Sequence, residues 1–244
     1  MGSASNMTPL HILQLSNVSI FNQLQIEEAL LRTDQRNWCI INEGSPPAIV
    51  MGISGKYNEL IHHEKLVETP IPVIRRFSGG GTVVVDANTH FITFICNTTF
   101  IPIKPFPEHI MRWTENIYQP VFSPHPFRLY ENDYVMGLKK FGGNAQSICK
   151  GRWLHHSSFL WDYSPDKMEY LKIPNKAPSY RLQRTHDEFL CRIRDYLPER
   201  HLFIDKFLKE IKSRFLVKEV EKEQVEKMLC IPHRKATAFI DREI

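Results

Sequence analysis

Three consecutive glycines, at positions 79–81, stand between two stretches that favour β-structure. Val73 to Arg76 leads into them, and Thr82 to Val85 follows with β-branched side chains that favour a buried strand. Residues without a Cβ atom let backbone N–H groups approach an anion closely, and the arginine pair before the glycines can bind phosphate oxygens in bidentate fashion. The pattern predicts two strands joined by a loop, which either binds an anion or serves only as a turn.

This loop matches neither of the two common phosphate-binding sequences. A P-loop would need Gly-Lys-Ser/Thr, and a dinucleotide-binding turn would need Gly-x-Gly-x-x-Gly. Each would also imply a fold that the surrounding pattern of strands does not support. These two classes of nucleotide-binding protein are therefore excluded.

The first quarter of the chain predicts a strand, a helix and a hairpin. Leu10 to Leu15 has strand character, and Ile20 to Leu31 has helical spacing. Trp38 to Asn42 and Ala48 to Gly52 are predicted as short strands, and the glycine and paired prolines at 43–47 indicate a turn. We therefore expect these two strands to form a hairpin.

The middle of the chain continues with strands around one helix. His90 to Cys96, Tyr134 to Ala145 and Trp153 to Leu160 are expected to be extended, and Glu108 to Tyr118 places apolar side chains on one helical face.

The final third changes to helical patterns. Thr185 and Glu188 have the spacing of a capping box ahead of an apolar series from Phe189 to Leu197. Ile204 to Phe215 is amphipathic, and Val220 to Met228 suggests a third helix. We expect residues 1–244 to form one α+β domain, with a mixed β-sheet, flanking helices and a helical C-terminal portion at 185–230.

Composition limits the class of protein. No apolar stretch approaches the roughly 18 to 20 residues that a membrane-spanning helix needs, and Met1 to Asn6 lacks the features of a secretory signal or transit peptide. The five cysteines include no C-x-x-C pair, which favours a reducing compartment. A net charge of +4, evenly spread, does not suit a nucleic-acid binder. We expect a soluble, cytoplasmic protein without membrane or nucleic-acid partners; a mitochondrial or plastid location would require a leader that has been removed.

Two further stretches carry candidate chemistry. The sequence KKFGGNAQ at 139–146 combines cationic side chains with glycines, and a compact lysine ammonium can stabilise charge that develops on a carbonyl or phosphate oxygen. His155 and His156 lie in an expected strand, so their side chains should point to opposite faces of the sheet. Two such histidines cannot readily share one ion, and no metal site is predicted.

Together these motifs resemble the lipoate-protein ligase A family. RRFSGGGTVVVD at 75–86 resembles the family hallmark, KFGGNAQ at 140–146 its lysine motif, and LHHSSFL at 154–160 its histidine segment, and their order and spacing agree as well. Glu131 to Asp133 resembles the short acidic signature ahead of the family lysine, and a looser resemblance extends from about Leu10 to Leu171. The resemblance implies the biotin/lipoyl protein ligase catalytic-domain fold, which is of the α+β class.

The resemblance also implies two half-reactions. Lipoate or octanoate and ATP give an acyl adenylate and pyrophosphate, and a lysine of a lipoyl domain then attacks the activated carbonyl. Mg²⁺ is expected with the triphosphate, held largely by phosphates because no metal-ligand cluster is visible. The implied acceptors are dehydrogenase E2 subunits and the glycine-cleavage H protein, and the positive net charge favours an acidic acceptor.

Candidate site residues follow from the matched positions. Lys140 is implied as the catalytic residue beside the carboxylate and α-phosphate. The implied nucleotide-binding positions are Arg76, Gly79, Gly80, Gly81, Thr82, Val83, Val84, Lys140 and Asn144. The implied lipoate-binding positions are Arg76, Ser78, Gly81, Lys140, Ala145 and His156. A tunnel for the acyl chain could include Leu24, Trp38, Val83 or Phe159, although an ordinary core position is the favoured interpretation of each.

Departures from the family pattern leave alternatives open. Val85 stands where the family commonly has histidine, Ser147 stands where an arginine often occurs, and the chain is too short for a full accessory domain. A transferase that uses pre-made lipoyl-AMP, a ligase that needs a separate accessory protein, and a non-catalytic lipoate sensor are therefore considered. An octanoyltransferase acting from acyl carrier protein would need an activated thiol, but no cysteine lies at 123–139, and Cys191 is expected in the core on an amphipathic helix.

Overall fold

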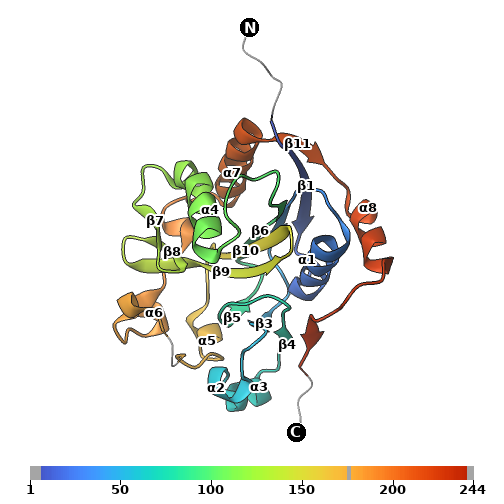
Figure 1. The fold of residues 1–244 in the computed structure, drawn as a ribbon. Coiled ribbons are helices and arrows are strands. Elements are labelled where there is room, and N and C mark those ends of the chain that lie inside the picture. The colour runs from blue at the N-terminus through green and yellow to red at the C-terminus, as the bar shows by residue number, and fades with distance from the viewer. Residues whose placement is uncertain (1–6, 175–176, 241–244) are drawn as a thin grey trace.

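Two β-sheets form the frame of the computed structural model, which describes residues 7–174 and 177–240 (Figure 1). The prediction for Met1 to Asn6 lies outside these residues. The large sheet contains β1 (Pro9–Ser16), β2 (Trp38–Glu43), β6 (Thr89–Asn97), β7 (Phe127–Tyr130), β8 (Asp133–Met136), β9 (Lys139–Cys149), β10 (Arg152–Leu160) and β11 (Leu216–Glu219). The small sheet contains β3 (Ala48–Met51), β4 (Val73–Arg75), β5 (Val83–Val85) and β12 (Ala238–Phe239).

Both sheets are mixed. The large sheet has the order β11-β1-β2-β6-β10-β9-β8-β7, in which β1 pairs in parallel with β2 and with β11 and the other pairs are antiparallel. The small sheet has the order β12-β4-β3-β5, with β3 and β4 parallel. The expected α+β architecture with a mixed sheet is therefore confirmed.

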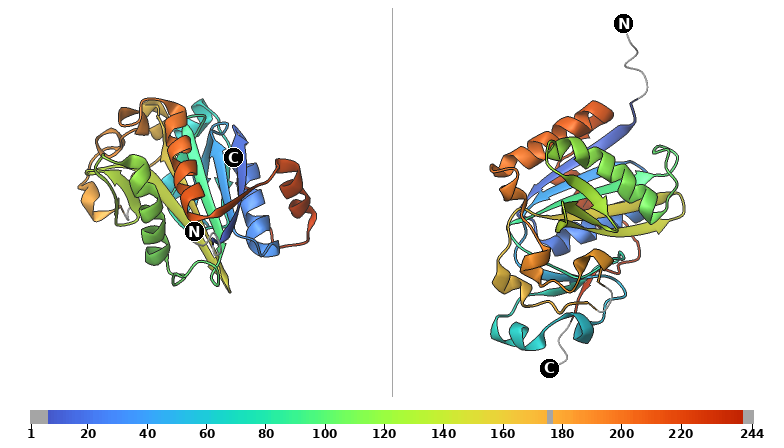
Figure 2. Two further views of the ribbon diagram at one scale, coloured as in Figure 1. Left: turned by 90° about the horizontal axis from the view of Figure 1, so that it is seen from above. Right: turned by 90° about the vertical axis from the view of Figure 1, so that its left-hand side faces the viewer.

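Helices cover the large sheet on both faces because its central strands carry apolar side chains on both. On one face α1 (Ile20–Thr33) packs with Leu13 and Ile40, and the Ser19 hydroxyl caps its first turn. On the other face lie α4 (Pro107–Phe122) and α7 (Arg200–Arg214), as the right-hand view of Figure 2 shows in green and orange.

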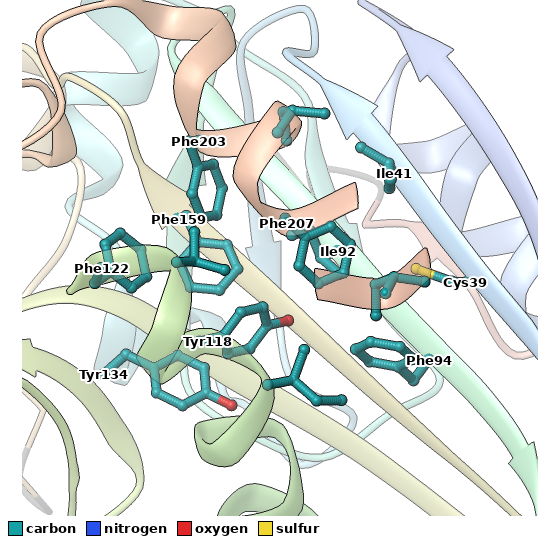
Figure 3. Close-up of a cluster of buried hydrophobic side chains, with 14 of the residues drawn as sticks. Cys39, Ile41, Ile92, Phe94, Tyr118, Phe122, Tyr134, Phe159, Phe203 and Phe207 are labelled. Carbon is teal, nitrogen blue, oxygen red and sulfur yellow. The ribbon is translucent and has the colours of Figure 1, made fainter. Parts of the chain in front are cut away.

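The core under α4 and α7 is rich in aromatic rings. Tyr118 from α4 and Phe207 from α7 have ring centroids 5.7 Å apart, and both are fully buried above Ile92 and Phe94 of β6 (Figure 3). Burying each such side chain contributes roughly 1.5–3 kcal/mol, so this cluster fixes the helices on the sheet.

The remaining helices are short. They are α2 (Tyr57–Leu60), α3 (His63–Glu68), α5 (Pro165–Met168), α6 (His186–Phe189) and α8 (Lys222–Glu226), with 3-10 turns at Ser179–Arg181, Ile193–Asp195 and Lys227–Cys230. Within residues 7–174 and 177–240, no helix is both long enough and apolar enough to cross a membrane.

The hairpin expected from β2 and β3 is wrong, because these strands belong to different sheets. The segment at 43–47 bends from the large sheet to the small one beside the turn that joins β5 to β6. Gly44 N–H bonds to Thr89 O at 3.0 Å and Ser45 N–H to Asp86 O at 3.2 Å. The following prolines have no N–H with which to continue a strand ladder, so a bend replaces the hairpin turn.

The C-terminal third is less helical than its pattern suggests. The Thr185–Glu188 capping box is present, but its helix ends at Phe189 instead of continuing to Leu197. The chain becomes extended there because Cys191 N–H bonds to Lys140 O at 2.8 Å. Cys191 is buried as expected but does not lie on a helix, and β11 completes the large sheet where no strand was predicted.

Candidate active site

A cavity of about 710 Å³ is lined by both sheets. The small sheet contributes β5 and the glycine loop, and the large sheet contributes β9 and β10. The segment from α5 to α6 supplies a further wall. The three motifs that are distant in the sequence therefore meet at one cavity.

The glycine loop lies directly on β9. Gly79 N–H bonds to Gln146 O at 2.9 Å, which links the first motif to the second. Gly80 has a φ of +121°, and a Cβ atom there would lie 2.8 Å from Asn144 O. Close approach of two backbones thus requires glycine at this position. Glycine is also required at position 52, because a Cβ atom there would lie 2.2 Å from Gly80 O.

Arg76 holds this loop from beneath. Its Nη2 donates to Gly81 O at 2.8 Å and to Gly79 O at 3.2 Å, and its Nη1 donates to Val50 O at 3.4 Å. Burial lowers the pKa of Arg76 to about 10, and the carboxylate of Glu27 opposes that shift. The guanidinium remains charged at neutral pH, but its Nη groups already bond to carbonyl oxygens.

Lys140 reaches into the cavity from the start of β9. Its Nζ lies 2.7 Å from Asp133 Oδ1, and the hydroxyl of Tyr180 donates to Asp133 Oδ2 at 2.9 Å. A Cβ atom at Gly143 would lie 3.6 Å from Lys140 Nζ, so the lysine side chain lies along β9. The ammonium of Lys140 therefore lies close to Gly143 of β9.

His156 and His155 point to opposite faces, as the strand register predicts. His156 lines the cavity and bonds through Nδ1 to Glu27 Oε1 at 2.9 Å, beside Thr93. Thr93 donates its hydroxyl to Glu27 Oε1 at 2.7 Å. His155 bonds instead to Thr114 and Tyr134 beneath α4, and burial lowers its pKa to about 3.

Most of the predicted site residues line this cavity. They are Arg76, Gly79, Gly80, Gly81, Thr82, Val83, Val84, Lys140, Asn144, Ala145 and His156. Ser78 is not among the lining residues; it is buried with its hydroxyl unpartnered among the described residues. Leu24, Trp38 and Phe159 are core residues, and Val83 alone of the suggested tunnel residues lines the cavity.

Several lining residues or their partners were not assigned a role from the sequence. The sequence pattern around Glu27 predicted a helix but no role for this residue. A glutamate on the apolar face of a helix is a signal for a buried partner. Asp133 lay in the acidic signature but without a stated contact. Tyr180 and Arg181 had no local signal, since their positions depend on how the segment after α5 folds back.

The carboxylates present do not form a metal site. In the described part of the chain, no three His, Cys, Asp or Glu side chains are grouped as metal ligands. Asp133 is the acidic residue that lines the cavity, and it already pairs with Lys140. The residues fit Mg²⁺ only as an ion that phosphates would hold.

The arrangement defines an α+β domain in which residues of both mixed sheets line a cationic cavity. The profile of the family described as Lipoyl protein ligase A/B catalytic domain matches residues 19–216. This chain belongs to that family.

Curated relatives agree with the family assignment. A Plasmodium falciparum protein named Inactive lipoate–protein ligase 2 is 27% identical, covering 83% of this chain and 69% of that protein. Lipoate-protein ligase LplJ of Bacillus subtilis is 30% identical over 59% of this chain and 43% of its own length. The chain thus spans less than half of the second relative.

Solved structures share the fold. A bi-partite lipoate protein ligase from Thermoplasma acidophilum, studied with its E2 lipoyl domain, gives a TM-score of 0.74 at 16% identity, covering 92% of this chain and 91% of that one. A lipoate-protein ligase A bound with ATP gives 0.68 at 15% identity, covering 92% and 93%. At these identities the comparison shows the fold alone.

Proposed function

We propose that this chain is a lipoate-protein ligase, which activates lipoate or octanoate with ATP and transfers the acyl group to a lysine of a lipoyl-domain protein. The observation that carries the proposal is the position of Lys140, whose ammonium lies in the same cavity as the glycine loop. ATP and lipoate ligands in related structures, and the E2 lipoyl domain studied with the Thermoplasma protein, support the choice of substrates and acceptor.

Two groups in this chain would serve both half-reactions. Lys140 would stabilise negative charge on the carboxylate and phosphate oxygens, and Asp133 would keep its ammonium in place. The backbone of Gly79 to Gly81, held by Arg76, would approach the phosphate closely. In the second step the neutral acceptor amine forms a C–N bond with the acyl carbon and releases one proton to solvent, and AMP leaves with the electrons of the broken C–O bond.

A second candidate is a transferase that receives pre-made lipoyl-AMP. The commitment of Arg76 to three carbonyl oxygens favours it, because those donors are then not free to bind a triphosphate. Val85 and Ser147 also take the places of polar family residues. The name of the Plasmodium relative, an inactive ligase, argues against a complete ligase reaction but not for the transferase in particular. A separate accessory protein could supply the adenylation step.

A thiol mechanism has less support. Burial raises the pKa of the Cys191 thiol to about 11, which disfavours the thiolate that acyl transfer requires. Cys149 is exposed at the end of β9 and is not among the cavity-lining residues. A Cys149→Ala, Cys191→Ala double variant should therefore keep its transfer activity.

The test is the mass of an apo lipoyl domain after incubation with purified protein and Mg²⁺, with either lipoate and ATP or synthetic lipoyl-AMP as donor. Product from both donors would support the ligase, and product from lipoyl-AMP alone would support the transferase. Lys140→Ala should lower either rate at least ~100-fold if its charge acts in the transition state. Tight binding of lipoyl-AMP without any product would instead indicate a sensor, and both enzymatic proposals would fail.

A further inference from the structure

The segment at 231–240, here called the strap, runs from the end of the 3-10 turn after α8 to the edge of the small sheet (Figure 1). Its last part, β12, pairs with β4, so that Ala238 lies opposite Arg75 and Phe239 opposite Ile74. Arg75 directly precedes Arg76, whose side chain holds the glycine loop. The strap is therefore the outer neighbour of the strand from which the glycine loop starts.

Glu28 of α1 tethers the strap before it reaches β4. The Glu28 carboxylate accepts the Ala236 N–H at 2.9 Å and the Thr237 N–H at 3.0 Å. Glu28 is only 2% exposed, and Arg32, one helical turn later, pairs with its Oε1 at 2.9 Å. A buried carboxylate is unfavourable unless donors surround it, so the two strap amides and Arg32 are held around Glu28 together.

The tether also reaches the glycine loop through Phe77, which stands two residues before the first glycine. The Arg32 guanidinium carbon lies 6.0 Å from the centroid of the Phe77 ring. Phe77 is buried in the same apolar cluster as Val225 of α8, and Ala236 of the strap packs against that cluster. Glu28 is thus connected both to the strand before the loop and to the residue at its start.

The glycine loop depends on such neighbours for its shape. Its three glycines carry no side chains, and its backbone is fixed from outside, by the bond from Gly79 N–H to Gln146 O and by Arg76 beneath it. Glycine loses more conformational freedom on ordering than any other residue, so fixing the loop beforehand favours anion binding. Of the described residues that line the cavity, none belongs to the strap, and Glu28 is not among them.

We propose that Glu28 is a positioning residue, which tethers the strap against β4, thereby fixes the glycine loop, and so sets the affinity of the chain for an acyl adenylate. The identity of this ligand rests on the proposed function, whereas the tether does not. Lys140 belongs to the large sheet and is held there by Asp133. Loss of the tether should therefore raise the KM for lipoyl-AMP and leave kcat nearly unchanged.

Two variants break the tether from opposite sides. Glu28→Gln keeps the side-chain volume but replaces one acceptor oxygen by an N–H donor, and Ala236→Pro removes the amide that donates to both carboxylate oxygens. Titration calorimetry should show the affinities for lipoyl-AMP and AMP weakened about 3- to 30-fold in each variant. The kcat for transfer from lipoyl-AMP should stay within about 2-fold of wild type while KM rises. Because both changes break the same contact, their effects should not add in the double variant.

Glu115→Gln is the matched control. Glu115 of α4 also accepts a backbone N–H, from Leu129 of β7 at 2.6 Å, and pairs with Arg112 at 2.9 Å. It ties a helix to the opposite edge of the large sheet and does not line the cavity. Glu115→Gln should therefore change neither the affinities nor kcat.

Unchanged affinities in Glu28→Gln and Ala236→Pro would overturn the proposal, and so would a fall in kcat as large as the rise in KM, or losses that add in the double variant. If Glu28→Gln does not fold, Ala236→Pro decides alone. If the wild-type chain binds lipoyl-AMP without transferring it, the proposed function fails, while the affinities still decide the role of Glu28. If it binds neither lipoyl-AMP nor AMP, the role of Glu28 proposed here fails as well.

Discussion

Gly80 and Gly81 are neighbours with different structural demands. Gly80 has a φ of +121°, and a Cβ atom there would meet Arg76 Nη2 at 2.7 Å and Asn144 O at 2.8 Å. Around Gly81 a Cβ atom would meet nothing within 4 Å. Side chains at the two positions should therefore act on different properties of the protein.

We expect Gly80→Ala to lower the free energy of unfolding by about 1–3 kcal/mol from backbone strain, with a further loss from the clash with β9. Gly81→Ala should leave the free energy of unfolding within about 0.5 kcal/mol of wild type. It should nevertheless weaken lipoyl-AMP binding, since Gly81 lines the cavity. Urea denaturation and calorimetric titration measure the two effects. Equal stabilities of the two variants would contradict this account of the loop.

At the residue scale, sequence reasoning found the motifs but not all of their partners. The glycine loop, Lys140 and His156 meet at one cavity. The Tyr180–Asp133 bond joins residues that are 47 positions apart, and no local pattern encodes such a contact. Phosphate binding by Arg76 stays a prediction. Its Nη2 group bonds to the loop carbonyls of Gly79 and Gly81, because buried carbonyl oxygens need donors.

At the element scale, hydrophobic periodicity predicted the long helices and strands. Which strands pair with each other depended on the rest of the chain. The helix at Ile20–Thr33 and the strand at Thr89–Asn97 follow from their patterns. The bend at 43–47 has the residues of a hairpin turn but pairs with the bend after β5. The strand β12 has two residues, too few for any period to show, and is formed by its neighbour β4.

That last strand is tethered by a buried carboxylate. Glu28 of α1 accepts hydrogen bonds from Ala236 N–H at 2.9 Å and Thr237 N–H at 3.0 Å, just before β12. The strand then pairs Ala238 with Arg75, the residue before Arg76. Glu28 therefore links α1 to the strand that enters the glycine loop.

We expect Glu28→Ala to release β12, because each lost charge-assisted hydrogen bond contributes roughly 1.5–3 kcal/mol. The Ile240 amide, which donates to Val73 O at 2.8 Å, should then exchange with solvent deuterium at least ~10-fold faster. Amides at the centre of β10 should keep their protection. Glu59→Ala is the control, since its pair with Lys56 is exposed. Unaltered exchange at Ile240 would show that β12 is held by other contacts.

At the scale of the whole molecule, the two sheets place titratable groups in surroundings that no single element provides. His90 of β6 lies at 0% exposure against Trp161 and Phe203 of α7, with ring centroids 6.0 and 5.8 Å away. Neither of its ring nitrogens has a hydrogen-bond partner among the described residues. Burial, and to a smaller degree Arg200, lowers its pKa to about 3. The folded protein therefore keeps this imidazole neutral.

This predicts a loss of stability in mild acid. The unfolded chain protonates His90 below its ordinary pKa of 6.5, whereas the folded chain does so only near 3. Protonation of His90 therefore does not lower the free energy of unfolding above pH 6.5. As the pH falls from 6.5 towards 3, the free energy of unfolding declines by about 1.4 kcal/mol per pH unit for one histidine. His155, with its pKa also lowered to about 3, should add a similar slope.

Urea unfolding at pH 7, 6, 5 and 4 measures the slope. His90→Phe should remove the contribution of His90 to this slope, because phenylalanine cannot bind a proton and can pack beside Trp161 and Phe203. His201→Gln should leave the slope unchanged, since the His201 side chain is 63% exposed. If His90→Phe and wild type lose stability in parallel between pH 6 and pH 4, protonation of His90 is not what destabilises the fold, and the acid sensitivity would have to come from His155 or from the carboxylates.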